Sequence, residues 1–409
     1  MIQPDAVYKH RWRQRILRTR RRYVFERWKA SQEKRPSLSQ LWRWMKNDFV
    51  FIFKWIKNII LQIRKYGKVI RENYKTSYPR QFWQLMYLRF VIREHPIQYR
   101  KRQLFKPKNW QFADQYEYGQ VITQLDLAKA SYPEEIDIIE DKFEFYSFCS
   151  QMKIKTPTVF SVFNNGKAVY PPREEFKLPR KDVFIKEQKG GKGAGVRKLT
   201  YSEGIYSDKN QTKLSAEDVH EYLLQSSQSN SDLIVQEVLK NHSAWQVFTP
   251  GSLATCRIVT ARHPEENSII PIFATFRMPV GNADNDNYST GGLASSVNLE
   301  NGILGRAVTV EPVNGQFEWT VHPDTKQQIE GTKLAFWNDI LAFALDVHGY
   351  FKTLVVGWDV SMTTDGCYMI EGNITWSAGL FENTNQIPLS RTIYPELYEK
   401  WMEKYTQTA

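Results

Sequence analysis

A glycine-rich segment between two short apolar runs is the feature that most limits how this chain can fold. Residues 182–199 read Asp-Val-Phe-Ile-Lys-Glu-Gln-Lys-Gly-Gly-Lys-Gly-Ala-Gly-Val-Arg-Lys-Leu. The runs predict two antiparallel strands, and the tip between them contains Lys189, Gly190, Gly191, Lys192 and Gly193. Because glycine permits positive φ and close backbone approach, successive N–H groups of such a tip can converge on an anion. The segment predicts a phosphate-gripping loop, with an ordinary exposed basic hairpin as the alternative.

Composition indicates a folded protein with a divided charge. The chain has 409 residues, of which 42% are hydrophobic and 14% aromatic, enough for two or three domains. Its three cysteines are far apart in sequence, which fits a reducing, cytoplasmic environment. Residues 1–108 contain 29 Lys and Arg against 6 Asp and Glu, whereas the rest contains 27 against 38. A basic N-terminal part is therefore joined to a mildly acidic body, and the two parts are expected to have different roles.

The N-terminal part is predicted to be helical. Residues 8–35 carry a dense run of Arg and Lys with interleaved aromatic residues, and helical patterns follow over residues 41–70 and 81–93. Lys54 and Lys57 interrupt the longer apolar stripe, which makes it too charged to span a bilayer. Three interpretations stay open for residues 1–110: helices that pack on the body, a basic amphipathic surface that lies on anionic lipid through residues 1–70, and nucleic-acid binding. No nucleic-acid-binding motif supports the third interpretation.

The body shows alternating helix and strand signals. A helix is predicted over residues 141–152, with Lys142 at its start, and a strand over residues 159–162. The sequence Ser-Ala-Glu-Asp at residues 215–218 resembles a capping box before a helix that extends to about residue 228. Residues 233–239, Leu-Ile-Val-Gln-Glu-Val-Leu, predict a buried strand.

Three oxygen-bearing side chains follow apolar runs near the C-terminus. Asp359 is predicted to end one strand, and Glu371 and Asn373 are predicted to end the next. If these strands are antiparallel neighbours, the three side chains lie close together. Mg²⁺ prefers such oxygen ligands, commonly one or two carboxylates with phosphate and water. The pattern predicts a magnesium site, with two solvated strand ends as the alternative.

Two arginines fall within predicted strands. Arg257 and Arg277 occur in Thr-Cys-Arg-Ile-Val-Thr and Ala-Thr-Phe-Arg-Met-Pro. An unpaired charge inside a strand is costly to bury, which favours a position facing a cleft that binds anions. A guanidinium can clamp a phosphate or carboxylate with two hydrogen bonds. A structural salt bridge is the alternative interpretation.

The order of these motifs resembles a known family. The glycine-rich hairpin, the Gln-Glu-Val-Leu strand end at residues 236–239, Asp286-Asn287, Gly291-Gly292 and the closing Glu371-Gly-Asn373 together are similar to the sugar-transfer-associated ATP-grasp family. The resemblance covers roughly residues 115–385. It implies an α+β ATP-grasp fold, two lobes with the nucleotide between antiparallel sheets, after a basic helical region. We expect divisions at 1–110, 111–240 and 241–409.

The resemblance also implies roles for individual residues. Lys142, Lys186 and the loop from Lys189 to Gly195 correspond to groups that contact the nucleotide phosphates, and Arg257 and Arg277 to groups that stabilise the transferring phosphoryl group. Adenine is expected beside Gln236, Glu237, Val238 and Leu239. His242 is a candidate for the ribose, although a plain surface histidine fits nearly as well. Asn287, Gly291 and Gly292 match an element that approaches the triphosphate, and Asp286 is a less certain neighbour. His322-Pro323 also matches a family element, but the sequence indicates no role for it.

The function implied is a Mg²⁺- and ATP-dependent carboxylate–amine ligase that forms an amide through an acyl phosphate. Its small-molecule substrates would be sugar-linked or amino-acid compounds of polysaccharide or related biosynthesis, and their identity stays open. A kinase with a hydroxyl acceptor is an alternative, because it needs the same lysines, loop and metal ligands. A non-catalytic nucleotide-binding protein targeted to a membrane surface is the other. We expect a cytoplasmic protein, with peripheral association at the inner face of the cell membrane left open.

Overall fold

The computed structural model describes residues 38–92, 94–117, 120–171, 177–190, 197–229 and 231–406. The Arg- and Lys-rich run at residues 8–35 and the loop residues Gly191, Lys192 and Gly193 lie outside the described residues. The chain divides into two compact units. The first is Met1–Gln120 with Asn314–Gln316 and Asn385–Ala409, and the second is Val121–Val313 with Phe317–Thr384. The three-part division expected from sequence stays a prediction.

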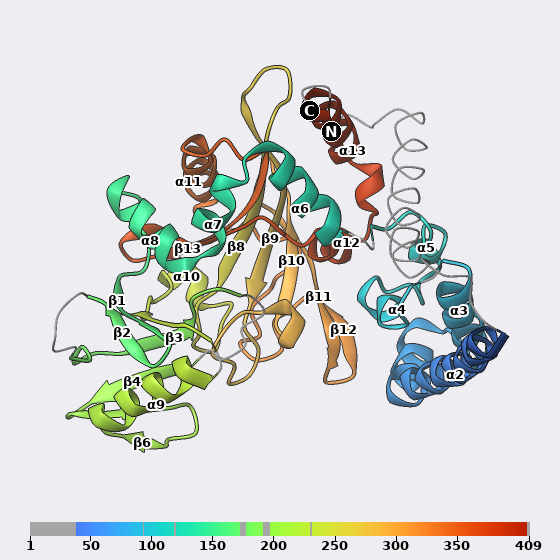
Figure 1. The fold of residues 1–409 in the computed structure, drawn as a ribbon, viewed down its shortest axis with the longest axis horizontal. Coiled ribbons are helices and arrows are strands. Elements are labelled where there is room, and N and C mark those ends of the chain that lie inside the picture. The colour runs from blue at the N-terminus through green and yellow to red at the C-terminus, as the bar shows by residue number, and fades with distance from the viewer. Residues whose placement is uncertain are drawn as a thin grey trace. The chain divides into compact units, whose positions relative to one another are not determined.

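The described part of the first unit is helical (Figure 1). The predicted helices are confirmed with shifted ends, as α2 (Leu38–Tyr74) and α3 (Tyr78–Phe90), followed by α4 (Ile97–Lys101), α5 (Pro107–Trp110), η2 (Leu389–Arg391) and α13 (Tyr394–Thr406). Helices α2 and α3 meet at Gly67, where a Cβ atom would lie 3.0 Å from both Ile63 and Tyr78. Among the described residues, no helix has the length and apolar character needed to cross a membrane.

The smaller sheet of the second unit contains the predicted hairpin. Within the described residues it has seven strands in the order β2-β1-β7-β3-β4-β5-β6. Strands β3 and β4 pair antiparallel, with Val183 opposite Leu199 and Ile185 opposite Arg197. The strands are β1 (Val159–Asn164), β2 (Lys167–Tyr170), β3 (Val183–Glu187), β4 (Arg197–Ser202), β5 (Ile205–Ser207), β6 (Lys213–Leu214) and β7 (Leu233–Glu237).

Helix α9 (Ala216–Ser229) covers the smaller sheet, and its predicted capping box is confirmed. The backbone N–H of Asp218 donates to Ser215 Oγ at 3.1 Å, and the N–H of Ser215 donates to the Asp218 carboxylate at 2.8 Å. These reciprocal bonds satisfy donors that a helix end leaves open. Val219 and Leu223, one turn apart, then face the core beside Val183, Ile185 and Val235.

The larger sheet has seven strands among the described residues, in the order β12-β11-β10-β9-β8-β13-β14. The predicted α+β class is therefore confirmed, with two antiparallel sheets. The strands are β8 (Thr255–Arg262), β9 (Ile269–Met278), β10 (Leu293–Val297), β11 (Leu304–Val313), β12 (Gln316–Trp319), β13 (Val355–Thr363) and β14 (Gly366–Asn373).

Helices close the core of the larger sheet. Helix α11 (Trp337–Gly349) packs on β8, β9 and β13, while α7 (Glu134–Glu140) and α8 (Lys142–Gln151) pack against β14 (Figure 1). Trp358 and Trp376 are fully buried. The other helices of this unit are α6 (Gln120–Ser131), α10 (Ser243–Gln246), η1 (Tyr288–Thr290) and α12 (Ala378–Asn385).

Candidate functional site

A buried ion-pair cluster crosses three adjacent strands of the larger sheet. Arg257 on β8 donates from Nε and Nη2 to the two carboxylate oxygens of Asp359 on β13, both at 2.7 Å. Arg277 on β9 donates from Nη2 to Asp359 Oδ2, also at 2.7 Å. One carboxylate thus holds two guanidinium groups, each only 9% exposed. The salt bridge considered at the sequence level is present, and it leaves a net positive charge on this group of three.

Arg277 is held from its other side as well. Thr255, opposite Arg277 in the register of β8 and β9, accepts from its Nε at 2.9 Å and its Nη2 at 2.5 Å. The Thr255 hydroxyl itself donates to the carboxylate of Asp286, which lies 3.4 Å from Arg277 Nε. The plane of the Arg277 guanidinium is therefore fixed by two carboxylates and one hydroxyl.

Electrostatics favours the charged forms of Asp359 and Arg277, whereas burial disfavours the charged form of Asp286. Burial works to raise the pKa of Asp359, but the charges of Arg257 and Arg277 outweigh it and hold that pKa well below its usual range. Burial also works to lower the pKa of Arg277, whereas Asp286, Asp359 and Glu371 raise it. For Asp286, burial is the dominant cause and raises the pKa of its carboxyl group.

The three predicted metal ligands lie together on β13 and β14. Asp359 is directly opposite Glu371, and Asn373 is opposite Gly357. The prediction that Asp359 ends its strand is wrong: it lies in the middle of β13, because pairing with β14 continues to Thr363 and Gly366. Two carboxylates opposite each other repel unless a cation lies between them, and here Arg257 Nη2 lies 3.7 Å from Glu371 Oε1.

These side chains fit a magnesium ion in their chemistry. Glu371 is 29% exposed on the edge strand β14, and the Asn373 amide is oriented by donating from Nδ2 to Gly357 O at 3.3 Å. Within the described part of the chain, no group of three His, Cys, Asp or Glu side chains is arranged for a metal. Both oxygens of Asp359 already accept from Arg257 and Arg277, so this carboxylate could reach Mg²⁺ only through its remaining lone pairs, beside Glu371 and Asn373. Such an oxygen set suits Mg²⁺, which usually keeps water and phosphate ligands.

Lys186 brings a charge from the smaller sheet to this cluster. It lies on β3 and is 8% exposed. Burial lowers the pKa of its ammonium to about 8, with opposing effects from the negative charges of Glu371 and Asp359 and a further lowering by Lys142. The packing of the second unit therefore brings Lys186, Lys142, Asp359 and Glu371, which are far apart in sequence, into one electrostatic environment.

Lys142 joins helix α8 to the start of the glycine-rich loop. Its Nζ donates to the carbonyl of Gly190 at 2.8 Å, and its backbone N–H donates to the carbonyl of Gln188 at 3.2 Å. The preceding residue, Asp141, caps α8 and also accepts from the Gln188 side chain at 2.9 and 3.1 Å. Lys189 Nζ lies 3.6 Å from Asp141 Oδ2. The helix start thus positions the first loop residues.

The predicted adenine-contact segment begins inside a central strand and leaves it. Gln236 is buried on β7, Glu237 is its last residue, and Val238 and Leu239 follow outside the sheet. Glu237 pairs with Thr158 twice: its N–H donates to Thr158 O at 2.9 Å, and its carboxylate accepts from Thr158 N at 3.2 Å.

His242 lies just after this segment and caps a short helix. Its Nδ1 accepts from the backbone N–H of Ala244 at 3.1 Å at the start of α10, and its ring meets Phe336 edge-on at 4.6 Å. These contacts give the histidine a structural task in addition to the ribose contact expected from the resemblance.

The turn between β9 and β10 carries the Asn-and-glycine element. Asn287 accepts from the N–H and hydroxyl of Ser289 at 3.0 and 2.8 Å and thereby begins η1. Gly291 has φ +117°, a backbone region in which side chains are strained. A Cβ on Gly292 would lie 2.7 Å from the carbonyl oxygen of Asp286, so only glycine fits there. The turn places Asp286 beside Arg277.

The His322-Pro323 element fastens a loop to the end of β9. His322 is fully buried, with Nε2 3.0 Å from Pro279 O, and Nδ1 accepts from the N–H of Asp324 at 3.3 Å. Burial lowers the pKa of this histidine. The side chain of Asp324 accepts from Gly281 N at 2.7 Å.

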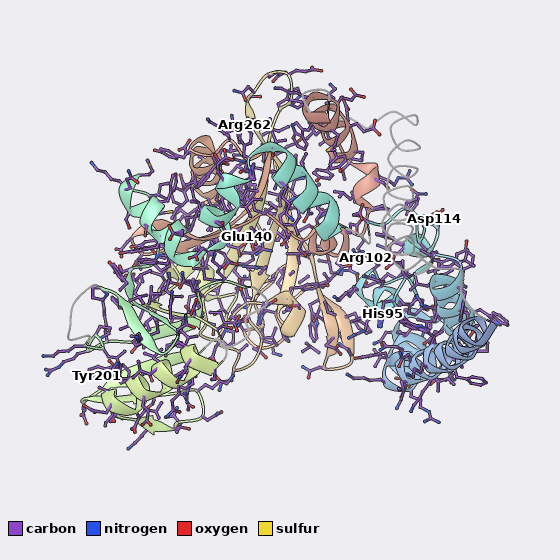
Figure 2. All side chains as sticks on the ribbon, viewed as in Figure 1. His95, Arg102, Asp114, Glu140, Tyr201 and Arg262 are labelled. Carbon is purple, nitrogen blue, oxygen red and sulfur yellow. The ribbon has the colours of Figure 1, made fainter. Side chains whose placement is uncertain are left out.

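Sequence reasoning assigned no role to several residues that hold the site. Thr255 orients Arg277 by a hydrogen bond across two strands. Asp141 holds the start of the loop by accepting from the Gln188 side chain, and the Gln188 carbonyl accepts from the backbone N–H of Lys142. For Asp141, the predicted helix began at this residue, whereas in the structure Asp141 is the N-cap and the helix begins at Lys142; aspartate is a preferred N-cap, and that preference was the available signal. Glu140 is similar: at the end of α7 (Figure 2), it accepts from the N–H of Ile374, next to Asn373, at 3.2 Å.

Comparison with known proteins identifies the class to which this site belongs. The family model described as sugar-transfer associated ATP-grasp matches residues 125–394. That range is well over half of the chain, so the protein belongs to the sugar-transfer associated ATP-grasp family. No curated protein matches the chain in sequence.

Solved structures show a distant likeness. They include D-alanyl-alanine synthetase A from Vibrio cholerae O1 (13% identity, 68% of this chain and 67% of that chain, TM-score 0.35). D-alanine–D-alanine ligase from Bacillus anthracis has 10% identity over 66% of this chain and 70% of that chain, with a TM-score of 0.37. N5-carboxyaminoimidazole ribonucleotide synthetase from Thermotoga maritima has 13% identity over 59% of this chain and 43% of that chain, with a TM-score of 0.30. At this level of identity and TM-score, the substrates of these proteins say nothing about the substrates of this chain.

Proposed function

We propose that this protein is an ATP-dependent ligase that joins a carboxylate to an amine, with Mg²⁺ as cofactor and an acyl phosphate as intermediate. The observation that carries the proposal is the convergence of Lys186 from the smaller sheet with Arg257, Arg277, Asp359 and Glu371 from the larger one. In a member of an ATP-grasp family, such a buried, mainly cationic cluster suits a triphosphate and a developing acyl phosphate.

In the first step, a substrate carboxylate oxygen attacks the γ-phosphorus of ATP. The new P–O bond gives an acyl phosphate, and the bond to the bridging oxygen breaks to release ADP. Lys142, Lys186 and the loop from Lys189 would neutralise phosphate charge, with Asn287, Gly291 and Gly292 close to the triphosphate. Arg277, whose guanidinium plane is fixed by Thr255 and Asp359, is preorganised to hold the transferring group.

In the second step, an amine attacks the carbonyl carbon of the acyl phosphate. Phosphate leaves with the electrons of the C–O bond, the nitrogen loses a proton, and an amide remains. Arg257 uses Nε and Nη2 to hold Asp359, so it would bind the leaving phosphate or the substrate carboxylate through its remaining guanidinium N–H groups. Asp359, Glu371 and Asn373 would hold Mg²⁺, which supplies charge neutralisation for the phosphates when bound.

The remaining residues would hold the nucleoside. Backbone groups of Gln236, Glu237, Val238 and Leu239 lie where β7 leaves the sheet, which suits hydrogen bonds to an adenine edge. We assign His242 to the ribose. We place nucleotide binding by the hairpin in residues 111–240, and the phosphate and metal ligands in residues 241–409. Cys149, Cys256 and Cys367 are unpaired, which suits a cytoplasmic protein.

ADP release from Mg-ATP, measured with pooled carboxylates and amines and with or without hydroxylamine, tests this function. ADP together with a hydroxamate supports the ligase, because hydroxylamine traps only an activated carboxylate. ADP without a hydroxamate contradicts it and favours a hydroxyl acceptor, as in a kinase. Failure of the protein to bind ATP at all would refute the nucleotide site itself.

A further inference from the structure

Helix α3 buries two glutamines and exposes several aromatic side chains. Its buried face combines Leu85 and Leu88 with two glutamines, Gln81 and Gln84. Gln81 donates to the carbonyls of Gly67 and Thr76 at 3.0 and 2.8 Å, and the side-chain oxygen of Gln84 accepts from the Tyr99 hydroxyl at 2.7 Å. These hydrogen bonds fix the rotation of the helix about its axis and decide which residues face outward.

The outward face is therefore aromatic. Trp83 is 68% exposed, Tyr87 45% and Phe90 42%, and Val91 directly after the helix is 60% exposed. Positions 83, 87 and 90 have the spacing of a single helix stripe. Single exposed apolar residues need no explanation, but a full stripe of large ones does. Helix α2 of the same unit adds exposed Phe53, Ile60 and Leu61.

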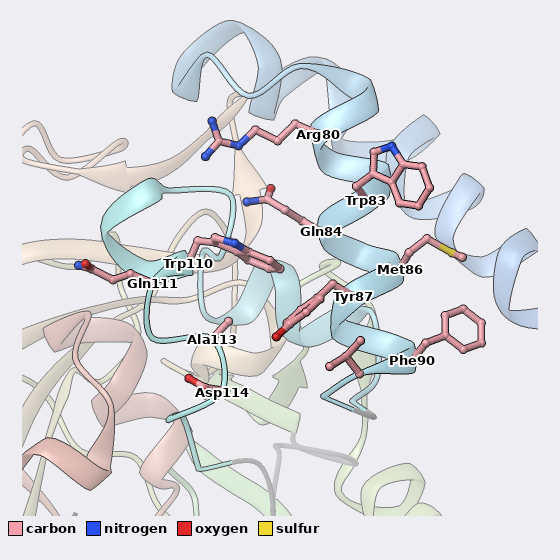
Figure 3. A pocket seen from close by; sticks show the side chains of 11 residues that line it. Arg80, Trp83, Gln84, Met86, Tyr87, Phe90, Trp110, Gln111, Ala113 and Asp114 are labelled. Carbon is pink, nitrogen blue, oxygen red and sulfur yellow. The ribbon is translucent and has the colours of Figure 1, made fainter.

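A pocket accompanies this stripe. It has a volume of about 910 Å³ and lies between α3 and the segment around α5, with Trp83, Tyr87, Phe90 and Trp110 among its lining residues. Figure 3 shows Trp83, Met86 and Phe90 projecting from one side of α3, while Tyr87 points toward Trp110. The rings of Tyr87 and Trp110 meet edge-on at 5.7 Å. None of the residues of the candidate active site lines this pocket.

The stripe belongs to a segment with a large excess of basic residues. Residues 38–117 contain 17 Lys and Arg but five Asp and Glu, and two of those acids, Glu94 and Glu117, are buried. Arg80 and Asp114 both line the pocket, and Arg89 lies over the ring of Trp55 at 3.7 Å. A partner for this surface must therefore accept aromatic side chains and carry negative charge.

We propose that the exposed stripe of α3, formed by Trp83, Tyr87, Phe90 and Val91, is a docking surface for an anionic lipid bilayer. Tryptophan and tyrosine prefer the boundary between headgroups and acyl chains, because each has an apolar body and a polar tip. Lys and Arg around them add attraction to anionic headgroups. A second copy of this chain fits less well, since two surfaces of the same strong positive charge repel each other.

The test is sedimentation of the full-length protein with vesicles of phosphatidylcholine, with or without phosphatidylserine, at low and high salt. We expect binding to the anionic vesicles that weakens with salt. Replacement of Trp83 and Phe90 by serine should lower the partition coefficient about tenfold or more, since two large apolar side chains no longer leave water. A second variant, which combines Tyr87→Ser with Val91→Ser, should also lower the partition coefficient.

The matched control replaces Val169 and Tyr350, which are similarly exposed but lie in the second unit, by serine and should bind like wild type. Circular dichroism confirms that each variant is folded. Three outcomes would overturn the proposal. Wild type could ignore anionic vesicles, both stripe variants could bind as wild type does, or the stripe could instead drive concentration-dependent self-association in the absence of lipid.

Discussion

At the residue scale, the decisive property of the site is how one carboxylate organises several cations. Asp359 holds Arg257 and Arg277 at 2.7 Å and contributes to the electrostatic environment of Lys186. Buried charges are stable only when they are paired, so each of these side chains depends on the others for its position. Thr255 extends this arrangement, because its hydroxyl accepts from Arg277 and donates to Asp286.

The lowered pKa of Lys186 predicts pH dependence. Affinity for ATP should fall as pH rises through about 8, because the ammonium that would contact phosphate loses its proton. Lys186→Arg should bind nucleotide with a flat profile across this range, since arginine stays charged. Calorimetric titration with a non-hydrolysable ATP analogue, with exposed Lys213→Arg as control, measures this; identical profiles for wild type and Lys186→Arg would contradict the prediction.

The same shift has a consequence for stability. The folded-state pKa of Lys186 lies below its ordinary value of 10.5, so the unfolded chain binds more protons between about pH 8 and pH 10.5. The contribution of Lys186 to the free energy of unfolding is therefore least favourable below pH 8 and improves as pH rises through that window. The free energy of unfolding of wild type, relative to Lys186→Met, should therefore rise between about pH 8 and pH 10.5, and urea unfolding of both proteins across this range measures the difference.

Thr255 is expected to act by positioning Arg277. Thr255→Val removes the hydroxyl that accepts from Arg277 and leaves the shape of the residue nearly unchanged. The rate of ADP formation should fall about tenfold or more, with a smaller change in KM for ATP. Thr255→Ser keeps the hydroxyl and should retain most of the activity. Wild-type activity in Thr255→Val, or a loss confined to Thr255→Ser, would contradict this role and point to packing of the threonine methyl group.

At the element scale, the site is assembled by turns and helix ends as much as by strands. The N-terminus of α8 holds the first residues of the glycine-rich loop through Asp141 and Lys142. The turn between β9 and β10 brings Asp286 to Arg277. Loops of this kind carry function when a rigid sheet fixes their ends, and here both ends enter paired strands.

The turn between β9 and β10 provides a test at this scale. In Gly292→Ala, the new Cβ would lie 2.7 Å from Asp286 O and 3.1 Å from Asn287 O, so the backbone must move. We expect a loss of stability of about 1–3 kcal/mol and weaker nucleotide binding. Gly251→Ala is the matched control, because a Cβ there meets nothing within 4 Å. Thermal unfolding that shifts equally in both variants would refute the steric argument.

At the scale of the whole second unit, two sheets contribute to one site. Lys186 belongs to the smaller sheet, and Glu371 belongs to the edge strand of the larger one. Their electrostatic interaction arises from packing within the unit, since they are far apart along the chain.

Glu371 tests the proposed metal site at this scale. Glu371→Ala should abolish ATP turnover but leave the fold intact, because the side chain is partly exposed and its contact with Arg257 is 3.7 Å long. ADP formation and circular dichroism, compared with exposed Glu300→Ala, provide the measurement. Normal turnover in Glu371→Ala would remove this residue from the metal site.

The sequence by itself determined the local elements and the class of the protein. The apolar runs of residues 183–187 and 233–237 form paired strands, and Ser215 with Asp218 starts α9, because these signals depend on neighbours along the chain. The spacing of the motifs likewise led to the family, which the match over residues 125–394 confirms.

Only the tertiary structure decided how the charges pair and which faces stay exposed. The position of Asp359 inside β13, its two arginine partners and the role of Thr255 depend on the register of adjacent strands. The outward aromatic face of α3 likewise follows from hydrogen bonds of Gln81 and Gln84 to residues outside the helix. Register and helix rotation are set by contacts between segments distant in sequence, so no local pattern contains them.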